Sequence, residues 1–148
     1  MKKTIMGLAL MSAVATASAV DFGVGYSRDT TNDVNGVGLS VTQSWKQFSL
    51  TAGVERFDVS VGEQSQFSLI AGYQFAKLAG VALEGQFGAA YIVSDSAKDG
   101  LTSVVGLGAS MPIYQNISIT ADARRNIGTG SMKVHDGTTV GVGLKYSF

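Results

Sequence analysis

The 148-residue chain contains no cysteine, one proline and one histidine. Without cysteine, no disulfide can stabilise it in an oxidising compartment. Charged residues make up 15% of the sequence, against about 25% in an ordinary soluble domain. The formal net charge is zero and no basic run is present, which argues against nucleic acid as a partner. Both the stability and the surface of this protein must therefore differ from those of a typical soluble or disulfide-rich domain.

A hydrophobic run long enough for a membrane-spanning helix is also missing. The apolar stretch at residues 5–15 falls well short of the roughly 20 residues that such a helix needs. It follows Lys2 and Lys3 and precedes the small residues Ala17 and Ala19, which is the order found in a secretory signal peptide. We expect residues 1–19 to be cleaved after Ala19, leaving residues 20–148 as one domain. Loss of the two lysines would leave a formal charge of −2.

Glycine, in contrast, is abundant, with nineteen residues in the chain. So much glycine disfavours helix, and no segment after residue 19 has a convincing helical period. Instead, large apolar residues alternate with small or polar ones at the period of two that is typical of β-strands. Eight such segments lie near residues 20–27, 36–45, 48–55, 67–75, 81–93, 105–111, 117–124 and 139–148.

The connectors between these segments alternate in length. Short ones fall at 45–47, 76–80 and 112–116, whereas longer polar ones fall at 28–35, 57–66, 94–100 and 127–138. Short turns at one end and longer loops at the other are typical of outer-membrane barrels. Each strand with its connector receives about 16 residues, enough for a spanning strand of about 9–11. We predict an all-β fold, an eight-stranded antiparallel up-and-down transmembrane β-barrel closed by its first and last strands.

A soluble barrel would alternate in the same way but turn its apolar face inward. Here the non-apolar face is mostly Gly, Ser, Thr and Ala, which suits the narrow inside of an eight-stranded barrel better than a water-exposed surface. Aromatic residues also gather toward the two ends of the segments, as in the girdles of membrane barrels. The predicted girdle at the short-turn end comprises Phe22, Trp45, Phe48, Tyr73, Phe75, Tyr114, Tyr146 and Phe148, and the one at the long-loop end Tyr26, Phe57, Phe67 and Tyr91.

The alternation continues to the last residue of the sequence. One face of this segment carries Val140, Val142, Leu144, Tyr146 and Phe148. With its apolar residues at every second position before a terminal aromatic, the segment resembles the signal by which barrel-assembly machinery recognises its clients. The whole of residues 20–148 resembles the small OmpA/OmpX-like class of eight-stranded outer-membrane barrels. The resemblance implies periplasmic termini and surface-exposed longer loops, but no particular function, because this class includes adhesins, structural proteins and enzymes.

Charged residues on the predicted inward face are candidates for a functional network. They are Glu55, Glu84, Asp122, Arg124 and Lys145, with Asp21 near one rim. Charges in a narrow barrel must pair or reach water. We expect Lys145 to pair with Glu84, and Arg124 with Glu55 or Asp122, so that ion pairs fill the interior. The alternative is a gated polar path for small solutes.

Evidence for catalysis or for a cofactor is weak. The lone histidine, His135, lies in the predicted last loop beside Asp136, without the serine partner that a lipid-modifying enzyme would need. Acidic residues in the loops do not follow a calcium-loop spacing, and the Gly-rich stretches lack the following helix of a phosphate loop. We expect no enzyme activity, no cofactor and no metal.

Three arginines, Arg28, Arg56 and Arg125, fall at the predicted loop-side rim. A guanidinium there could bind lipopolysaccharide phosphates, or it could simply extend to the membrane interface. The resulting hypothesis is a monomeric protein of the Gram-negative outer membrane with a structural or surface-interaction role. Its expected partners are outer-membrane lipid and lipopolysaccharide, with periplasmic chaperones and the assembly machinery during export. A narrow, porin-like channel for small or hydrophobic solutes is the alternative, and a lipid-modifying enzyme is the third.

Overall fold

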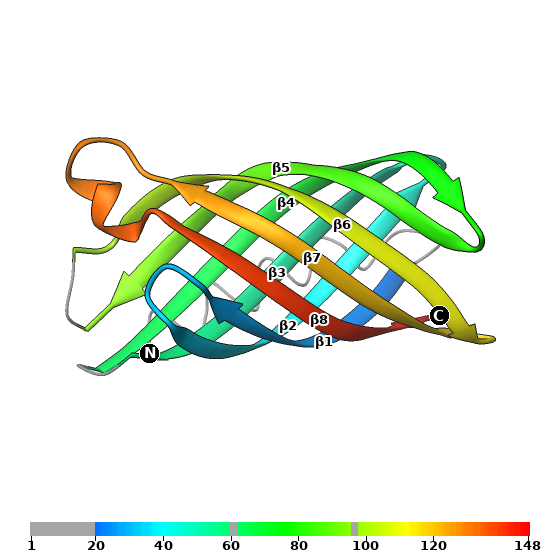
Figure 1. Cartoon of the computed structure of the whole chain (residues 1–148), viewed down its shortest axis with the longest axis horizontal. Helices are drawn as coiled ribbons and strands as arrows, with labels where there is room; N and C mark the ends of the chain where they lie inside the picture. The colour runs from blue at the N-terminus through cyan, green and yellow to red at the C-terminus, as the bar shows by residue number, and fades with distance from the viewer. Residues whose placement is uncertain (1–19, 60–61, 96–97) are drawn as a thin grey trace.

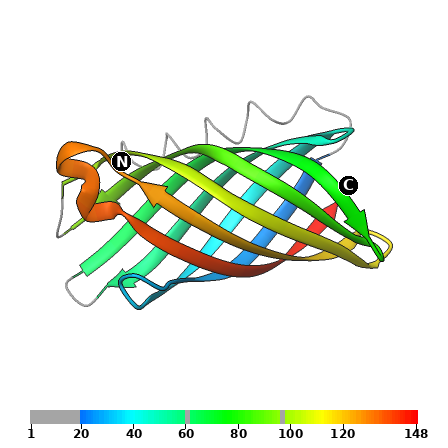
Figure 2. The ribbon, with the colours of Figure 1, turned by 45° about the horizontal axis from the view of Figure 1, so that its top comes forward.

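The computed structural model describes residues 20–59, 62–95 and 98–148, and the expected signal peptide with Ala17 and Ala19 lies outside these residues. Eight antiparallel strands close into a barrel in which each strand pairs with the next and β8 pairs with β1. The cylinder and its inclined strands are visible in Figures 1 and 2. The predicted fold is thus confirmed. The strands are β1 (Val20–Asp29), β2 (Val34–Trp45), β3 (Phe48–Val59), β4 (Gly62–Leu78), β5 (Val81–Ser94), β6 (Gly100–Tyr114), β7 (Ile117–Ile127) and β8 (Gly137–Ser147).

The strands are strongly staggered around the barrel. A row of inward residues paired from strand to strand leaves β5 at Glu84 and, after one circuit, returns to β5 at Ser94. The row therefore climbs ten residues per turn, and such a stagger accompanies strands inclined at about 35–45° to the axis. As a result, residues that face each other across the lumen are not those that pair in the ladder.

The outward face of the barrel is apolar. Within the described residues, 26 large hydrophobic side chains are exposed, against seven buried hydrophobic residues. A soluble domain buries most of its large hydrophobic side chains, so this distribution is inverted. The inward face carries mostly small and polar residues, as the sequence predicts, with a few buried apolar exceptions such as Ile92 and Val104. A short 3-10 helix, η1 (Gly130–His135), lies between β7 and β8 at the loop end, and no helix in the described part of the chain is long and apolar enough to cross a membrane.

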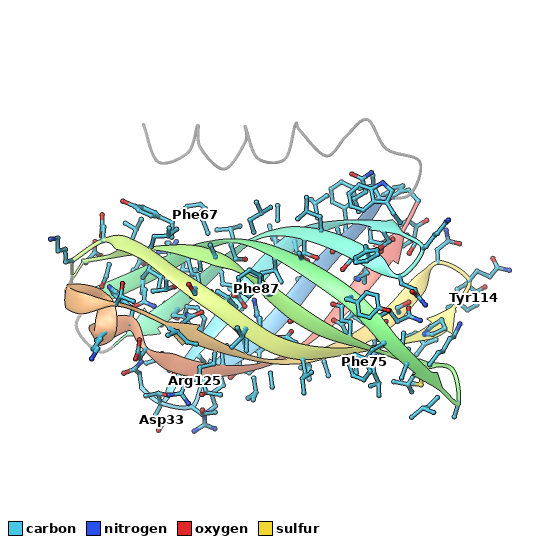
Figure 3. The ribbon with its side chains drawn as sticks, turned by 90° about the horizontal axis from the view of Figure 1, so that it is seen from above. Asp33, Phe67, Phe75, Phe87, Tyr114 and Arg125 are labelled. Carbon is cyan, nitrogen blue, oxygen red and sulfur yellow. The ribbon has the colours of Figure 1, made fainter. Side chains whose placement is uncertain are left out.

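The aromatic girdle at the turn end is dense. Phe22 packs edge-to-face against Phe148 with ring centroids 5.3 Å apart, and Phe48 lies 5.1 Å from Tyr73. Figure 3 places Phe75 and Tyr114 toward this end and Phe67 toward the loop end. The prediction for the loop end was wrong in one residue, Phe57, whose side chain is 2% exposed and faces Gly36 inside the barrel. The band between the girdles is not purely aliphatic either, because the exposed Phe87 lies in it (Figure 3).

Most connectors are shorter than the sequence predicts. Strand β3 continues to Val59 and β4 begins at Gly62, so the expected loop at 57–66 is largely a paired hairpin. This extension explains the error at Phe57, because a strand that continues past Glu55 turns position 57 inward. At the turn end, β4 reaches Leu78 and β6 reaches Tyr114. Ladder hydrogen bonds continue beyond the hydrophobic pattern, since backbone pairing does not depend on side-chain polarity.

Candidate functional site

The centre of the lumen is crossed by an ion triad, composed of Glu55, Asp122 and Arg124. Arg124 Nη2 donates to Glu55 Oε1 at 2.8 Å and Arg124 Nε donates to Asp122 Oδ2 at 2.6 Å. Because β3 and β7 lie four strands apart in either direction, the Arg124–Glu55 pair spans the barrel. The three side chains are 13%, 11% and 24% exposed for Arg124, Glu55 and Asp122. Arg124 therefore pairs with both Glu55 and Asp122, which the sequence offered as alternative partners.

Each member of the triad lies against a glycine on the neighbouring strand. A Cβ atom added at Gly38 would lie 2.7 Å from Glu55 Cγ, and one at Gly106 would lie 2.8 Å from Arg124 Cγ. At Gly141 the nearest atom would be Asp122 Oδ1, at 3.2 Å. Contacts under 3 Å are too short for any real side chain, so the first two glycines provide space that the triad occupies. The glycine-rich alternation that identifies the strands also makes room for long charged side chains.

Two amides extend the triad toward the loop end. Gln66 Nε2 donates to Glu55 Oε2 at 3.5 Å, and Asn126 Nδ2 donates to Gln66 Oε1 at 2.8 Å. Both amide residues are buried. The second bond joins β4 to β7 and is therefore another connection across the lumen. Sequence reasoning missed both residues because it placed Gln66 in the connector at 57–66 and ended the seventh segment at residue 124, whereas β4 and β7 include them.

Besides these polar groups, the lumen contains four buried apolar side chains, those of Phe57, Ala90, Ile92 and Val104. Ile92 and Val104 are 0% exposed, and Ala90 is 1% exposed. Ile70 packs with Ala90 and Val104 from the turn side. These side chains face inward, since Ile92 pairs with Gln66 and Gly100, and Val104 pairs with Gly88 and Asn126 in the inward rows. Breaks of the alternation at Ile70, Ile92 and Val104, where an apolar residue occupies an inward position, are the sequence signals that could have indicated these side chains.

Charges near the turn end are arranged differently from the expectation. Lys145 Nζ lies 3.8 Å from Asp21 Oδ2 on the adjacent strand β1 and not beside Glu84. Glu84 accepts hydrogen bonds from Gln86 Nε2 at 2.9 Å and Ser49 Oγ at 3.2 Å. The expected Lys145–Glu84 pair was wrong, because Lys145 has the carboxylate of Asp21 on the adjacent strand, and Glu84 is held by Gln86 and Ser49 instead. The sequence indicates how deep a residue lies in the barrel, but not its position around the barrel axis.

Two adjoining cavities occupy the turn half of the lumen. The lower one, of about 260 Å³, reaches the β2–β3 turn at Lys46 and Gln47. The upper one, of about 130 Å³, extends to Glu55, Arg124 and Ser27. Their shared wall consists of Ser40, Thr51, Gln86, Thr120, Asp122 and Lys145. The wall of the lower cavity is mostly polar, and the mixed wall of the upper one includes the charged side chains of Glu55, Asp122 and Arg124. Cavities of this size with several polar partners hold water, so the turn half of the lumen is hydrated up to the triad.

The loop end is tied to the barrel rim by buried polar side chains. His135 on η1 is 7% exposed, and its Nε2 atom donates to the carbonyl oxygen of Lys98 at 2.8 Å. Asp29 accepts from the backbone N–H groups of Thr31 and Asn32 at 2.8 and 3.2 Å. The bond of His135 therefore goes to a backbone carbonyl and not to a described hydroxyl or carboxylate. No group of three or more His, Asp or Glu residues within the described ranges could hold a metal ion.

The three rim arginines differ in their surroundings. Arg28 pairs with Asp33 and Arg56 pairs with Glu63, and all four side chains are more than half exposed. Arg125 is exposed as well, but it forms no ion pair with any described residue. Figure 3 shows Arg125 and Asp33 toward the loop end of the barrel. Of the three candidates for contact with lipid phosphates, Arg125 alone has its guanidinium free of a neighbouring carboxylate in the described chain.

The last strand carries the residues that sequence reasoning assigned to an assembly signal. Val140, Val142, Leu144, Tyr146 and Phe148 are all exposed on the outward face. Their strand is paired along its length with both β7 and β1. Tyr146 and Phe148 stack edge-to-face with centroids 4.8 Å apart. In the closed barrel, this segment therefore joins the last strand to the first and presents a row of apolar side chains on the outward face.

Barrels of known structure share this architecture. The N-terminal β-barrel domain of Pseudomonas aeruginosa OprF has a TM-score of 0.72 and 16% identity, covering 88% of this chain and 97% of that one. Ail of Yersinia pestis, determined in a phospholipid bilayer nanodisc, gives 0.60 and 16%, covering 89% and 100%. The outer membrane enzyme PagL gives 0.56 and 16%, covering 88% and 99%. No protein-family model and no curated protein matches the sequence.

At these identities the likeness concerns the fold. The chain has the fold of the small OmpA/OmpX-like outer-membrane barrels. Because PagL is an enzyme with the same architecture, the fold does not decide between enzymatic and non-enzymatic roles. The decision must come from the residues of the lumen and the loops.

Proposed function

We propose that this chain is an integral protein of the Gram-negative outer membrane, in which the barrel is a closed anchor and the loops are the contact surface. The observation that carries this proposal is the filled lumen. The triad and the Gln66–Asn126 bond both cross it, and Phe57, Ala90, Ile92 and Val104 are buried within it. A pore would need open space along the whole axis, whereas the two described cavities extend from the turn end only as far as the triad. The exposed apolar outward face supports residence in lipid, because it would be unfavourable in water.

Two measurements test this role together. Purified protein in planar lipid bilayers should give no steady conductance. Cells that carry a barrel with the η1 segment, residues 130–135, replaced by a Gly-Ser linker should lose surface binding to host or envelope ligands while their permeability stays unchanged. A steady open pore in the native protein would refute the closed anchor. Binding that persists after replacement of every loop would refute the contact surface.

A non-enzymatic role is supported by the environment of the lone histidine. His135 is buried and its Nε2–H is held by a backbone carbonyl, so this nitrogen is unavailable as a base. The test is mass spectrometry of acyl chains in phospholipids and lipopolysaccharide from membranes with and without the protein. We expect identical profiles. A change in acylation that His135→Ala abolishes would replace the anchor proposal with a lipid-modifying enzyme.

The proposed partners follow from the same surfaces. Outer-membrane lipid would cover the apolar band, and lipopolysaccharide phosphates would contact Arg125 in preference to the paired Arg28 and Arg56, since a free guanidinium keeps its donors available. During export the chain would be handled by periplasmic chaperones and the barrel-assembly machinery through its last strand. The barrel would act as a monomer. Loss of lipopolysaccharide co-purification in Arg125→Gln, but not in Arg28→Gln, is the expected result.

A further inference from the structure

We propose that the lower cavity of the lumen is a binding site for the primary ammonium group of a small linear amine, with Glu84 as its counter-ion. The amine enters from the turn end and stays in the turn half of the barrel. The closed anchor requires no such ligand, so the site gives the lumen a function of its own. Three features of the molecule support it: an accessible cavity, the surroundings of Glu84 and the charges of the wall.

The lower cavity is accessible from its mouth at the turn end. It has a volume of about 260 Å³ and extends to the β2–β3 turn. Four of its lining residues lie within one residue of the turn-end limit of their strands, and all four are small: Ser44, Ala82, Ser118 and Ser147. Small side chains at the strand ends leave room for an unbranched chain to enter. The entering chain displaces water, which this polar cavity holds.

Glu84 is a carboxylate of this cavity without a positively charged partner. Its oxygens accept hydrogen bonds from two neutral groups, Ser49 Oγ at 3.2 Å and Gln86 Nε2 at 2.9 Å, and it forms no ion pair with any described residue. A partly buried carboxylate is stabilised more by a cation than by neutral donors alone. The Oε1 atom of Gln86 is buried and has no hydrogen-bond partner among the described residues, so an acceptor for an ammonium N–H group lies beside Glu84.

The other charges of the lumen favour a cation over an anion. Asp21 pairs with Lys145, so these two residues add no net charge. The triad has two carboxylates for one guanidinium and therefore adds one negative charge to that of Glu84. The exposed Lys46 in the turn at the mouth offsets one of these two charges. The wall as a whole is thus negative, which attracts cations and repels anions.

The spacing of the carboxylates favours an amine over a metal ion. No group of three or more acidic or histidine side chains in the described part of the chain could hold a metal ion. Glu84 and Asp122 both line the lower cavity and lie in one inward row with Gly108 between them, so their Cα atoms are about 10 Å apart. An ammonium group needs only one carboxylate where neutral oxygens accept its other N–H bonds. Hydroxyl and amide groups, which supply such oxygens, make up much of this wall.

A series of ligands with the same four-carbon chain tests the site on the native barrel. Butanediol with a hydroxyl group at each end carries no charge, n-butylamine carries one positive charge, and the diamine putrescine carries two. Each ligand is titrated at low ionic strength into the purified, isotope-labelled barrel in detergent micelles. Backbone amide chemical shifts in nuclear magnetic resonance spectra then give both the affinity and the location of binding.

We expect butylamine to bind roughly tenfold more tightly than butanediol, a gain between those of exposed and buried ion pairs. Putrescine should bind about fivefold more tightly still, as for one more solvated ion pair, because its second ammonium group meets the excess charge of the triad. The shifts should centre on Ser49, Glu84 and Gln86. Equal affinities for butylamine and butanediol, or shifts confined to the loops, would overturn the site. Displacement of butylamine by equimolar potassium or magnesium chloride would overturn its assignment to amines.

Two carboxylate variants test the counter-ion. Glu84→Gln keeps the size of the side chain but removes its charge, so it should weaken butylamine binding to the level of butanediol. Glu63→Gln is the matched control, because Glu63 is exposed at the loop end and lies outside the cavity. Unchanged butylamine binding in folded Glu84→Gln would refute the assignment of Glu84. Should this variant fail to fold, the ligand series on the native barrel still decides whether the site exists.

The absence of cysteine allows a direct test of the entrance, because a single-cysteine variant carries one reactive thiol. Ser44→Cys places the thiol at the mouth of the lower cavity, and Lys98→Cys places it on the loop surface; both positions are exposed. Coupling of a bulky maleimide to Ser44→Cys should prevent butylamine binding, whereas the same label on Lys98→Cys should leave it unchanged. The reverse pattern would place the entrance at the loop end and overturn the proposal. Conductance of the native protein would instead refute the closed anchor, so the two failures are distinguishable.

Discussion

The triad provides the strongest stability prediction for this barrel. Arg124→Met keeps most of the unbranched stem but removes the charge that two carboxylates share. Removing one partner of a buried ion pair costs about 3–5 kcal/mol, because the other charge is left uncompensated. The presence of both Glu55 and Asp122 raises this cost, and the adjoining hydrated cavity lowers it by solvating Asp122, the more exposed of the two. We expect a loss of about 3 kcal/mol in the free energy of unfolding.

The assay uses the single tryptophan. Trp45 lies at the turn-end rim and is half exposed on the outward face, so its emission changes when the barrel leaves the bilayer. Urea-induced unfolding of protein in lipid vesicles gives the free energy from the midpoint and slope of the transition. Arg28→Met is the matched control, since it removes an exposed pair with Asp33 on the outside of the same barrel. Its unfolding free energy should equal that of the native protein within error.

A double-mutant cycle tests whether the loss arises from the uncompensated charge. Glu55→Gln in the Arg124→Met background removes one of the two unpaired carboxylates and should therefore recover part of the lost stability. If the two single losses simply added, Glu55 and Arg124 would be energetically independent despite their 2.8 Å contact. A loss below about 1 kcal/mol in Arg124→Met would equally refute the reasoning, because such a value is typical of solvent-exposed pairs.

Three further changes test other parts of the fold. Gly106→Ala should destabilise by about 1–3 kcal/mol in the same assay, because its Cβ would meet a backbone carbonyl at 2.6 Å, while Gly85→Ala, with open space around it, should not. Val142→Arg should cost about 2–4 kcal/mol in vesicles although the side chain is exposed, whereas a water-facing site would tolerate it. Phe148→Ala should lower the yield of assembly by reconstituted machinery several-fold and leave unassisted folding in detergent unchanged. An equal loss in both reactions would place the effect in the barrel and not in recognition.

How much of this structure could be predicted from the sequence depends on the range of the interaction concerned. The alternation of Val140, Val142 and Leu144 with glycine is local, and it gave the strand, its outward face and the fold class correctly. The expected partners of Arg124 were also among those observed. Barrel closure requires only that inward and outward faces alternate consistently, so the local pattern is sufficient for it.

The errors concern relationships across the lumen. Lys145 pairs with Asp21 and not Glu84, and Phe57 lies inside the barrel and not in a girdle. The pairing of Lys145 depends on position around the barrel, which is set by the ten-residue stagger. The inward position of Phe57 depends on where the β3–β4 hairpin ends. No local pattern encodes these features, because they are fixed by closure of the whole sheet. Sequence reasoning can identify which residues face inward, but the partner of each residue follows from position around the barrel.

The glycines explain why the buried apolar side chains of the lumen were also missed. In the sequence, a glycine on the inward face suggests an empty position. In the barrel, a long side chain from the neighbouring strand extends into the space that the glycine leaves. Gly36 leaves room for the Phe57 ring, just as Gly38 does for Glu55. The content of a narrow lumen therefore depends on pairs of positions, a large side chain and the glycine beside it in the ladder. Counting inward polar residues alone overestimates how open the interior is.

A filled lumen has a consequence for where recognition can occur. With the interior closed from the loop end and the wall facing lipid, the loop surface is the part of the molecule that remains accessible from outside. The described loop residues are held to the rim by the Asp29 turn and by His135 on the Lys98 carbonyl. Short connections of this kind lose little conformational entropy when a partner binds. Under the proposed function, the barrel would act as a rigid frame for a small preformed surface, and changes in its loops would alter specificity without disturbing the fold.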